Sequence, residues 1–105
     1  MNTAIQLNQN DAGVKIVFLC RDEDGRPIDL TKFTVDFFLY DGETLLNEGR
    51  TLCGKPDSQL GEADYLMTAD DTSTCGLFMG KLRLSNSVAD VRNIGGIPVE
   101  IRESF

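Results

Sequence analysis

Apolar side chains recur at every second position along most of this chain, and this alternation limits the folds open to it. In the clearest stretch, 33–40, one face carries Phe33, Val35, Phe37 and Leu39. A period of two is that of a β-strand, whose successive side chains point to opposite faces. An amphipathic helix needs apolar positions every three or four residues, and no long segment shows that spacing. The pattern therefore predicts an all-β fold.

Strand-forming stretches recur at intervals of roughly 8 to 12 residues, as is typical of sandwiches and barrels. We expect strands near 3–7, 14–21, 33–40, 44–48, 63–68, 76–84 and 97–102. The segment 49–60 is rich in turn-forming residues and is predicted to be a loop. Pro98 lacks an N–H group, so we expect it at a sheet edge or on the unpaired side of its strand. About seven short strands without a helix predict one antiparallel β-sandwich or barrel spanning residues 1–105.

Composition removes several functions. The chain has 105 residues and a net charge of −7, which disfavours nucleic acid and anionic membranes as partners. It contains no histidine, which excludes mechanisms that need an imidazole base or ligand. The longest apolar runs are far shorter than a membrane-spanning helix, and the first residues lack the pattern of a secretory signal. We expect folding in a cytosol, with no nucleic-acid or membrane partner.

The three cysteines form no recognised metal or disulfide pattern. Cys20, Cys53 and Cys75 are an odd number without a CxxC pair, so we interpret them as reduced thiols. The alternative is an immunoglobulin-type bridge between Cys20 and Cys75. Cys20 shares the parity of the inward residues of its strand, whereas Cys75 is out of step with those of its own, which argues against that bridge.

No motif points to catalysis, a cofactor or a metal. The stretch 49–56 approaches the phosphate-binding loop pattern, but Pro56 stands where a magnesium-binding Ser or Thr is required. The stretch 22–25 resembles a calcium loop, but Cys20 and Thr31 occupy ligand positions that require carboxylates. Asp36 lies among aromatic residues, and we interpret it as an outward aspartate facing solvent or a cross-strand cation. We therefore predict no catalytic residue, cofactor or metal ligand.

Two strands carry apolar residues on both faces. Val17 and Leu19 lie opposite the inward face of the first strong strand, and Phe38 and Tyr40 opposite that of the second. A two-layer sandwich needs one apolar face per sheet, so the second must be covered by the chain itself, covered by another chain, or left as a patch. Our hypothesis is that Val17, Leu19, Phe38 and Tyr40 belong to one protein interface.

A known family shares the order of these features. They are DEDGRPIDLT at 22–31, the aromatic strand 33–40, EADY at 62–65 with the polar stretch 68–72, GLFMGKL at 76–82 and IPVEI at 97–101. In this order they resemble the immunoglobulin-like β-sandwich domains of tailed-phage virion proteins, in particular the N-terminal domain of baseplate upper proteins. The resemblance implies a single antiparallel immunoglobulin-like β-sandwich of about seven strands. Such domains anchor fibres or decorate particles, often in rings.

The resemblance leads to an expected function. We expect a non-enzymatic structural or accessory protein of a bacteriophage virion, in the baseplate, tail or capsid, made in the host cytoplasm. Its expected partners are other virion structural proteins and further copies of itself. The alternatives are a bacterial immunoglobulin-like protein-binding module and a small carboxylate-dependent hydrolase, since a fold does not fix a function.

Overall fold

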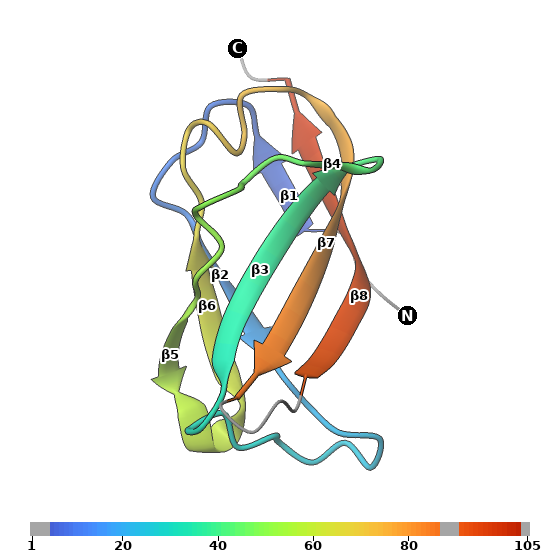
Figure 1. Ribbon diagram of the computed structural model, residues 1–105. Helices are drawn as coiled ribbons and strands as arrows, with labels where there is room; N and C mark the ends of the chain where they lie inside the picture. The colour runs from blue at the N-terminus through green and yellow to red at the C-terminus, as the bar shows by residue number, and fades with distance from the viewer. Residues whose placement is uncertain (1–4, 87–90, 104–105) are drawn as a thin grey trace.

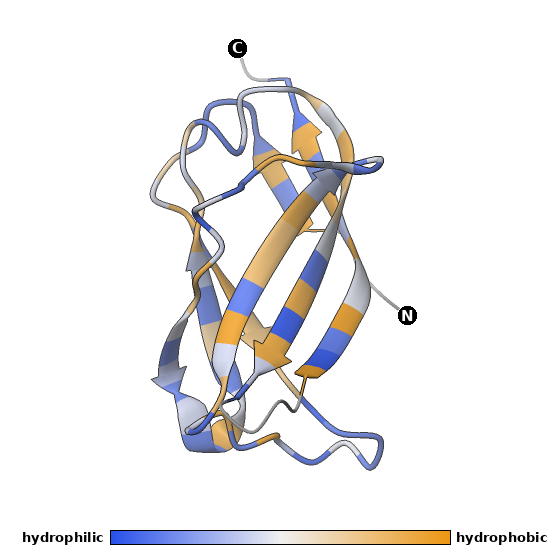
Figure 2. Cartoon of the chain, in the orientation of Figure 1, coloured by the Kyte–Doolittle hydropathy of each residue, from blue (hydrophilic) through white to orange (hydrophobic). Residues whose placement is uncertain are grey.

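The computed structural model describes residues 5–86 and 91–103, which form two β-sheets packed face to face (Figure 1). Figure 2 shows the underlying alternation most plainly on β7, whose residues switch between hydrophobic and hydrophilic along the strand. The described part of the chain holds no helix long and apolar enough to cross a membrane. The elements, in chain order, are β1 (Ile5–Asn8), β2 (Lys15–Leu19), β3 (Thr34–Asp41), β4 (Thr44–Leu45), β5 (Gly54–Asp57), the 3₁₀ turn η1 (Ser58–Leu60), β6 (Glu62–Leu66), β7 (Gly76–Ser85) and β8 (Val91–Arg102).

The strand order is that of an immunoglobulin-like sandwich. One sheet has the order β1-β8-β7-β3-β4 and the other β2-β6-β5. In immunoglobulin nomenclature, β2, β6 and β5 take the places of B, E and D, while β3, β7 and β8 take those of C, F and G. Strand β4 extends the second group as C′ does. The predicted all-β sandwich is therefore confirmed, with eight strands among the described residues.

The prediction of a wholly antiparallel fold was wrong at one pair. Strand β1 runs parallel to β8, with Ile5 opposite Val99 and Asn8 opposite Arg102, whereas the remaining pairs are antiparallel. Parallel neighbours need a long connection between them. Here almost the whole domain lies between β1 and β8, so the connection is available and the larger sheet is mixed.

The predicted loop at 49–60 contains a strand. Strand β5 pairs antiparallel with β6, from Gly54 opposite Asp64 to Asp57 opposite Glu62, with an irregular register between them. Its sequence, GKPD, has little intrinsic strand preference. Its pairing with β6 places it in the sheet, which is why the local sequence predicted a loop.

Strand β8 begins at Val91, earlier than the predicted 97–102. The prediction stopped at Gly95-Gly96, but the strand continues through both glycines. Gly80 of β7 pairs with Ile97 and Leu82 pairs with Ile94, so Gly95 and Gly96 together oppose a single residue. This bulge lets both isoleucines pack against the core although they are three positions apart. Gly96 has a φ of 73°, which glycine adopts without strain.

Pro98 lies inside the sheet rather than at its edge, because β8 is flanked by β7 and β1. Pro98 is opposite Met79 of β7 and immediately precedes Val99, the first residue that pairs with β1 among those described. Of the two predicted placements, the edge is therefore wrong. The other one, the unpaired side of the strand, stays a prediction, because the position of β1 that would continue the register past Val99 lies outside the described residues.

Aromatic rings join the two sheets at the centre of the core. The ring of Phe37 on β3 lies 5.2 Å from that of Phe18 on β2 and 4.9 Å from that of Tyr65 on β6, measured between centroids. Gly80 makes room for it, since a Cβ atom there would approach Phe37 Cε1 to 2.6 Å. All three cysteines are unpaired, with Cys20 and Cys53 buried and Cys75 exposed. The bridge between Cys20 and Cys75 does not form.

A buried polar network ties together the two loops that cross between the sheets. Asp71 Oδ1 accepts a hydrogen bond from Arg50 Nη1 at 2.9 Å. Its Oδ2 accepts one from the Tyr65 hydroxyl at 2.8 Å and one from the Thr68 N–H at 3.0 Å. Asn47 donates to the same hydroxyl at 3.2 Å. Burial, together with the bond to Asp71, raises the pKa of Tyr65 to about 12.

Candidate protein-binding face of the five-stranded sheet

The outer face of the larger sheet carries apolar side chains in register across several strands. Tyr40 on β3 is opposite Met79 on β7, which is opposite Pro98 on β8. Leu77 lies next to this row and is 70% exposed, and Met79 is 47% exposed. Because directly opposed residues share one face of a sheet, these side chains form one surface. We call this outer surface of β3, β7 and β8 the five-stranded face.

Cationic side chains lie over the aromatic rings of the five-stranded face. Arg83 Cζ lies 4.9 Å from the centroid of the Phe38 ring. Lys81 Nζ lies 5.9 Å from that of Tyr40. Both arrangements place a positive charge against the negative face of a ring. The face therefore combines apolar area with positive charge, on a chain whose net charge is −7.

Asp36 balances part of this charge. Its Oδ1 accepts a hydrogen bond from the Thr51 hydroxyl at 2.9 Å, and its Oδ2 lies 3.9 Å from Arg83 Nη2. Asp36 and Arg83 are opposite one another in the pairing of β3 and β7. This confirms the interpretation of Asp36 as an outward aspartate facing a cross-strand cation. Among the described residues, Lys81 has no carboxylate within 4.0 Å of its ammonium.

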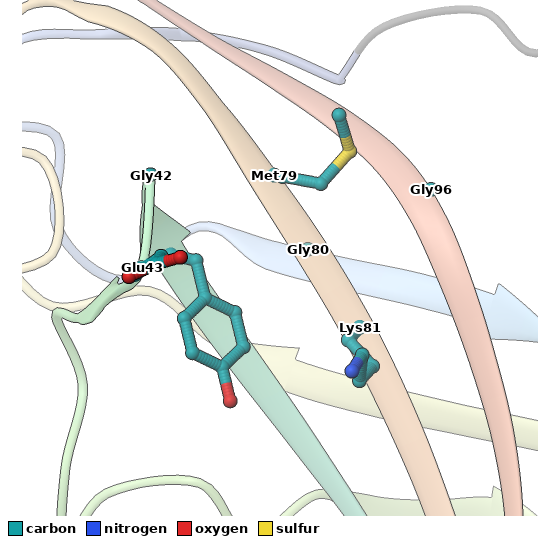
Figure 3. Close-up of a pocket in the computed structure, with 7 residues that line it drawn as sticks. Gly42, Glu43, Met79, Gly80, Lys81 and Gly96 are labelled. Carbon is teal, nitrogen blue, oxygen red and sulfur yellow. The ribbon is translucent and has the colours of Figure 1, made fainter.

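A hollow lies beside Lys81 on this face. It measures about 400 Å³. Figure 3 shows Met79 and Lys81 projecting from β7 on either side of Gly80, with Gly96 on the neighbouring strand. Gly96 adds no side chain to this space, whereas the missing side chain of Gly80 leaves room on the core side, for Phe37. The lining residues are Tyr40, Gly42, Glu43, Met79, Gly80, Lys81 and Gly96.

The four residues predicted to form one interface lie on two different sheets. Phe38 and Tyr40 belong to the five-stranded face and are half-buried, partly beneath Arg83 and Lys81. Val17 and Leu19 lie on β2, on the outer face of the smaller sheet, and are 53% and 57% exposed. Their outward orientation is confirmed. The structure does not bring the two pairs together on one surface of a single copy.

Sequence reasoning missed three contributors to the five-stranded face. Met79, Lys81 and Arg83 share one face of β7, opposite the buried set Phe78, Leu82 and Leu84. The same alternation that identified the buried set also gave this outward set. Whether this outward set joins the aromatic residues of β3 on one surface depends on which strand pairs with β7. That pairing joins residues far apart in the chain, so local sequence does not give it.

The rejected motifs have structural roles. Asp22 Oδ1 accepts hydrogen bonds from the N–H groups of Asp24 and Arg26 and so stabilises its own turn. Residues 49–56 form a loop and the start of β5. Asp71 is the one buried acid among the described residues, and its two oxygens already accept bonds from three residues.

The sequence comparisons found no relatives. No protein-family model matches the chain, and no curated protein matches it at a significant level.

Proposed function

We propose that this protein is a non-enzymatic structural or accessory protein of a bacteriophage virion, in the baseplate, tail or capsid. It acts by binding other virion proteins and further copies of itself. The observation that carries this proposal is the five-stranded face, on which Leu77 and Met79 are exposed beside two cation-covered rings. Exposed apolar area of this kind favours a protein partner.

The chemistry of the five-stranded face specifies its partner. Aromatic residues, methionine and arginine are enriched in the cores of protein interfaces. Lys81 and Arg83 attract acidic groups, so the partner surface is apolar with carboxylates at its rim. The immunoglobulin-like order and the sequence resemblance both support a module that binds through its own surface.

The first test is the composition of purified particles. If the proposal is right, virions purified from cells that carry this gene contain the protein at a fixed number of copies per particle. Quantitative mass spectrometry against the major capsid protein measures that number. Absence of the protein from particles overturns the proposal.

The second test uses variants of the five-stranded face. Met79→Asp adds a charge that repels an acidic partner, and we expect particles to lose the protein. Leu60→Asp is the matched control, because Leu60 is 60% exposed on η1, outside this face. Equal incorporation of both soluble, folded variants would show that the five-stranded face is not the binding surface.

A further inference from the structure

Strand β2 presents an open edge of the three-stranded sheet, since β6 is its one neighbour. The Cys20 N–H donates to the Gly61 carbonyl, and the Val14 carbonyl accepts from the Met67 N–H. The backbone N–H and C=O groups of the even-numbered residues of β2 therefore point toward β6. The backbone groups of the odd-numbered residues point away from the sheet. Among the described residues, nothing bonds to the N–H and C=O groups of Lys15, Val17 and Leu19.

Two of the other three sheet edges are protected, and the third belongs to β1, a strand of four residues. The segment after β4 covers β3, because the Phe37 N–H donates to the Thr51 carbonyl and the Cys53 N–H donates to the Val35 carbonyl. Strand β5 contains Pro56 and pairs irregularly. Proteins use such devices to prevent a sheet edge from pairing with another chain. Strand β2 has neither a proline nor a bulge, and its five residues pair with β6 in unbroken register.

The immunoglobulin order itself has room for a strand at this edge. In the constant-type sandwich, strand A pairs with B to complete a four-stranded sheet of order A-B-E-D. In this chain the N-terminal strand β1 pairs with β8 in the other sheet. The position next to β2 is therefore not taken by any described strand.

We propose that β2 of a second copy pairs with β2 in antiparallel orientation, about a two-fold axis at Val17. Val17 then lies opposite Val17 of the second copy, and Lys15 lies opposite its Leu19. This register satisfies the outward backbone groups of all three residues on both copies, because they are the odd-numbered set. It joins the two three-stranded sheets into one sheet of six strands.

Charge complementarity selects this register. Glu62 lies next to Leu19 across the β2–β6 pair. Lys15 of the second copy is therefore two strand spacings from Glu62, about 10 Å between backbones, which a lysine side chain can largely span. The two Asp64 residues are three spacings apart, about 14 Å, beyond a screening length of about 8 Å. A parallel pair in the same register would instead place Lys15 beside Lys15.

Exposed aliphatic side chains add to the contact. Val17, Leu19 and Leu66 are each more than half exposed on the outer face of the three-stranded sheet. Lys15 is opposite Leu66 within one copy. In the dimer each Leu19 is opposite Lys15 of the other copy, and Leu66 of that copy follows on the next strand. Pairing therefore gathers Val17 and Leu19 of both copies into one apolar cluster about the axis, with Lys15 between each Leu19 and the Leu66 of the other copy.

This inference deepens the proposed function, because it names the surface through which copies associate. Sedimentation equilibrium of the purified chain measures the association, and amide hydrogen exchange followed by NMR locates it. We expect a concentration-dependent dimer in which the Val17 and Leu19 amides become protected. A chain that stays monomeric, or a dimer whose β2 amides exchange as fast as in the monomer, overturns the inference. Protection that needs a foreign protein also overturns it.

Val17→Lys is the sharpest variant. In the monomer the new lysine lies opposite Asp64, so the fold is retained, whereas in the dimer two lysines face each other across the axis. We expect the dissociation constant to rise at least about fivefold. Leu60→Lys is the matched control, because it adds the same charge at an exposed leucine of η1, outside β2 and outside the five-stranded face. A dimer that is equally strong in both variants contradicts the proposed axis.

A charge exchange tests the register. Lys15→Glu and Glu62→Lys should each weaken the dimer, and the double variant should restore it, because the opposite pair is rebuilt in reverse. Failure of the double variant to recover overturns the register. The outcomes separate from those of the virion role: a monomer found in virions contradicts self-association and leaves the virion role standing, and a dimer absent from virions contradicts the virion role alone.

Discussion

The two outer faces of the sandwich arise from the same alternating pattern but have different chemistry. The five-stranded face carries rings beneath cations, next to a hollow that contains Lys81. The outer face of the three-stranded sheet carries aliphatic side chains with Asp64 and Glu62 and ends at an unpaired strand, β2. The first suits recognition through side chains, and the second suits recognition through backbone hydrogen bonds.

This difference shows what alternation alone determines. It specifies which residues of a strand point outward, and for Val17 and Phe38 it did so correctly. It does not specify which outward residues share a surface, because that depends on which strands are neighbours. Single substitutions that separate the core from the faces, and then one face from the other, test the comparison directly.

The largest effect is expected at the ring that joins the two sheets. Phe37→Ala should lower the free energy of unfolding by about 3–5 kcal/mol, because it leaves a cavity between Phe18 and Tyr65. Phe38→Ala, one residue along the same strand, removes an equal ring from the half-buried outer face and should cost about 1 kcal/mol. Urea unfolding measures both. Equal losses would mean that the two faces of β3 are not distinguished as described.

The next effect is expected at the polar network that fixes the crossing loops. Asp71→Ala removes the acceptor of Arg50, Tyr65 and Thr68 and should cost about 2–3 kcal/mol, because buried donors lose their partner. Asp70→Ala is the control, since Asp70 is exposed. A comparison of their urea midpoints tests the prediction. A loss below that of the control would show that the network does not stabilise the sandwich.

The strongly alternating strands could be predicted from sequence. Strands β2 and β3 and most of β7 lie within two residues of their expected positions, because burial of one face enforces the period of two. Strand β5 could not be predicted, since Gly54 and Pro56 are poor strand formers that enter the sheet through pairing with β6. The first half of β8 was missed because Gly95-Gly96 has the sequence of a turn and forms a bulge.

The candidate sites were predicted only in part. The outward orientation of Leu19 and Tyr40 followed from parity, but their assignment to one surface required that β2 and β3 share a sheet, and they do not. The role of Lys81 could not be inferred locally. Its position over the Tyr40 ring depends on the pairing of β7 with β3, which are about forty residues apart in the chain.

Alkaline pH should destabilise the core, through two buried groups that hold their protons more tightly in the folded chain. The native pKa of Tyr65 is about 12 against an ordinary value of 10.0, mainly because of burial. Burial likewise raises the pKa of Cys53 from 9.0 to about 12. The unfolded chain releases these protons first, so the contribution is complete below pH 9 and is lost as the pH rises to about 12. Urea unfolding from pH 8 to 12 measures the decline.

Variants of these two groups separate their contributions. Cys53→Ala should flatten the decline that begins near pH 9, and Tyr65→Phe the part between pH 10 and 12. Tyr65→Phe also loses the hydrogen bond to Asp71, so it should be less stable at pH 8. A decline of unchanged slope in the double variant would assign the alkaline loss to other groups.

The smallest effect on stability, and the clearest separation of the faces, is expected from charges placed on each. Leu19→Lys lies beside Glu62 within its own chain but would oppose Lys15 of a second copy, so it should abolish dimers and leave virion incorporation intact. Phe38→Glu lies opposite Lys81 but repels an acidic partner, so it should do the reverse. Each should change unfolding by about 1 kcal/mol or less. If either variant abolished both activities while folded, the two faces would act as one surface, as the hypothesis of a single interface states.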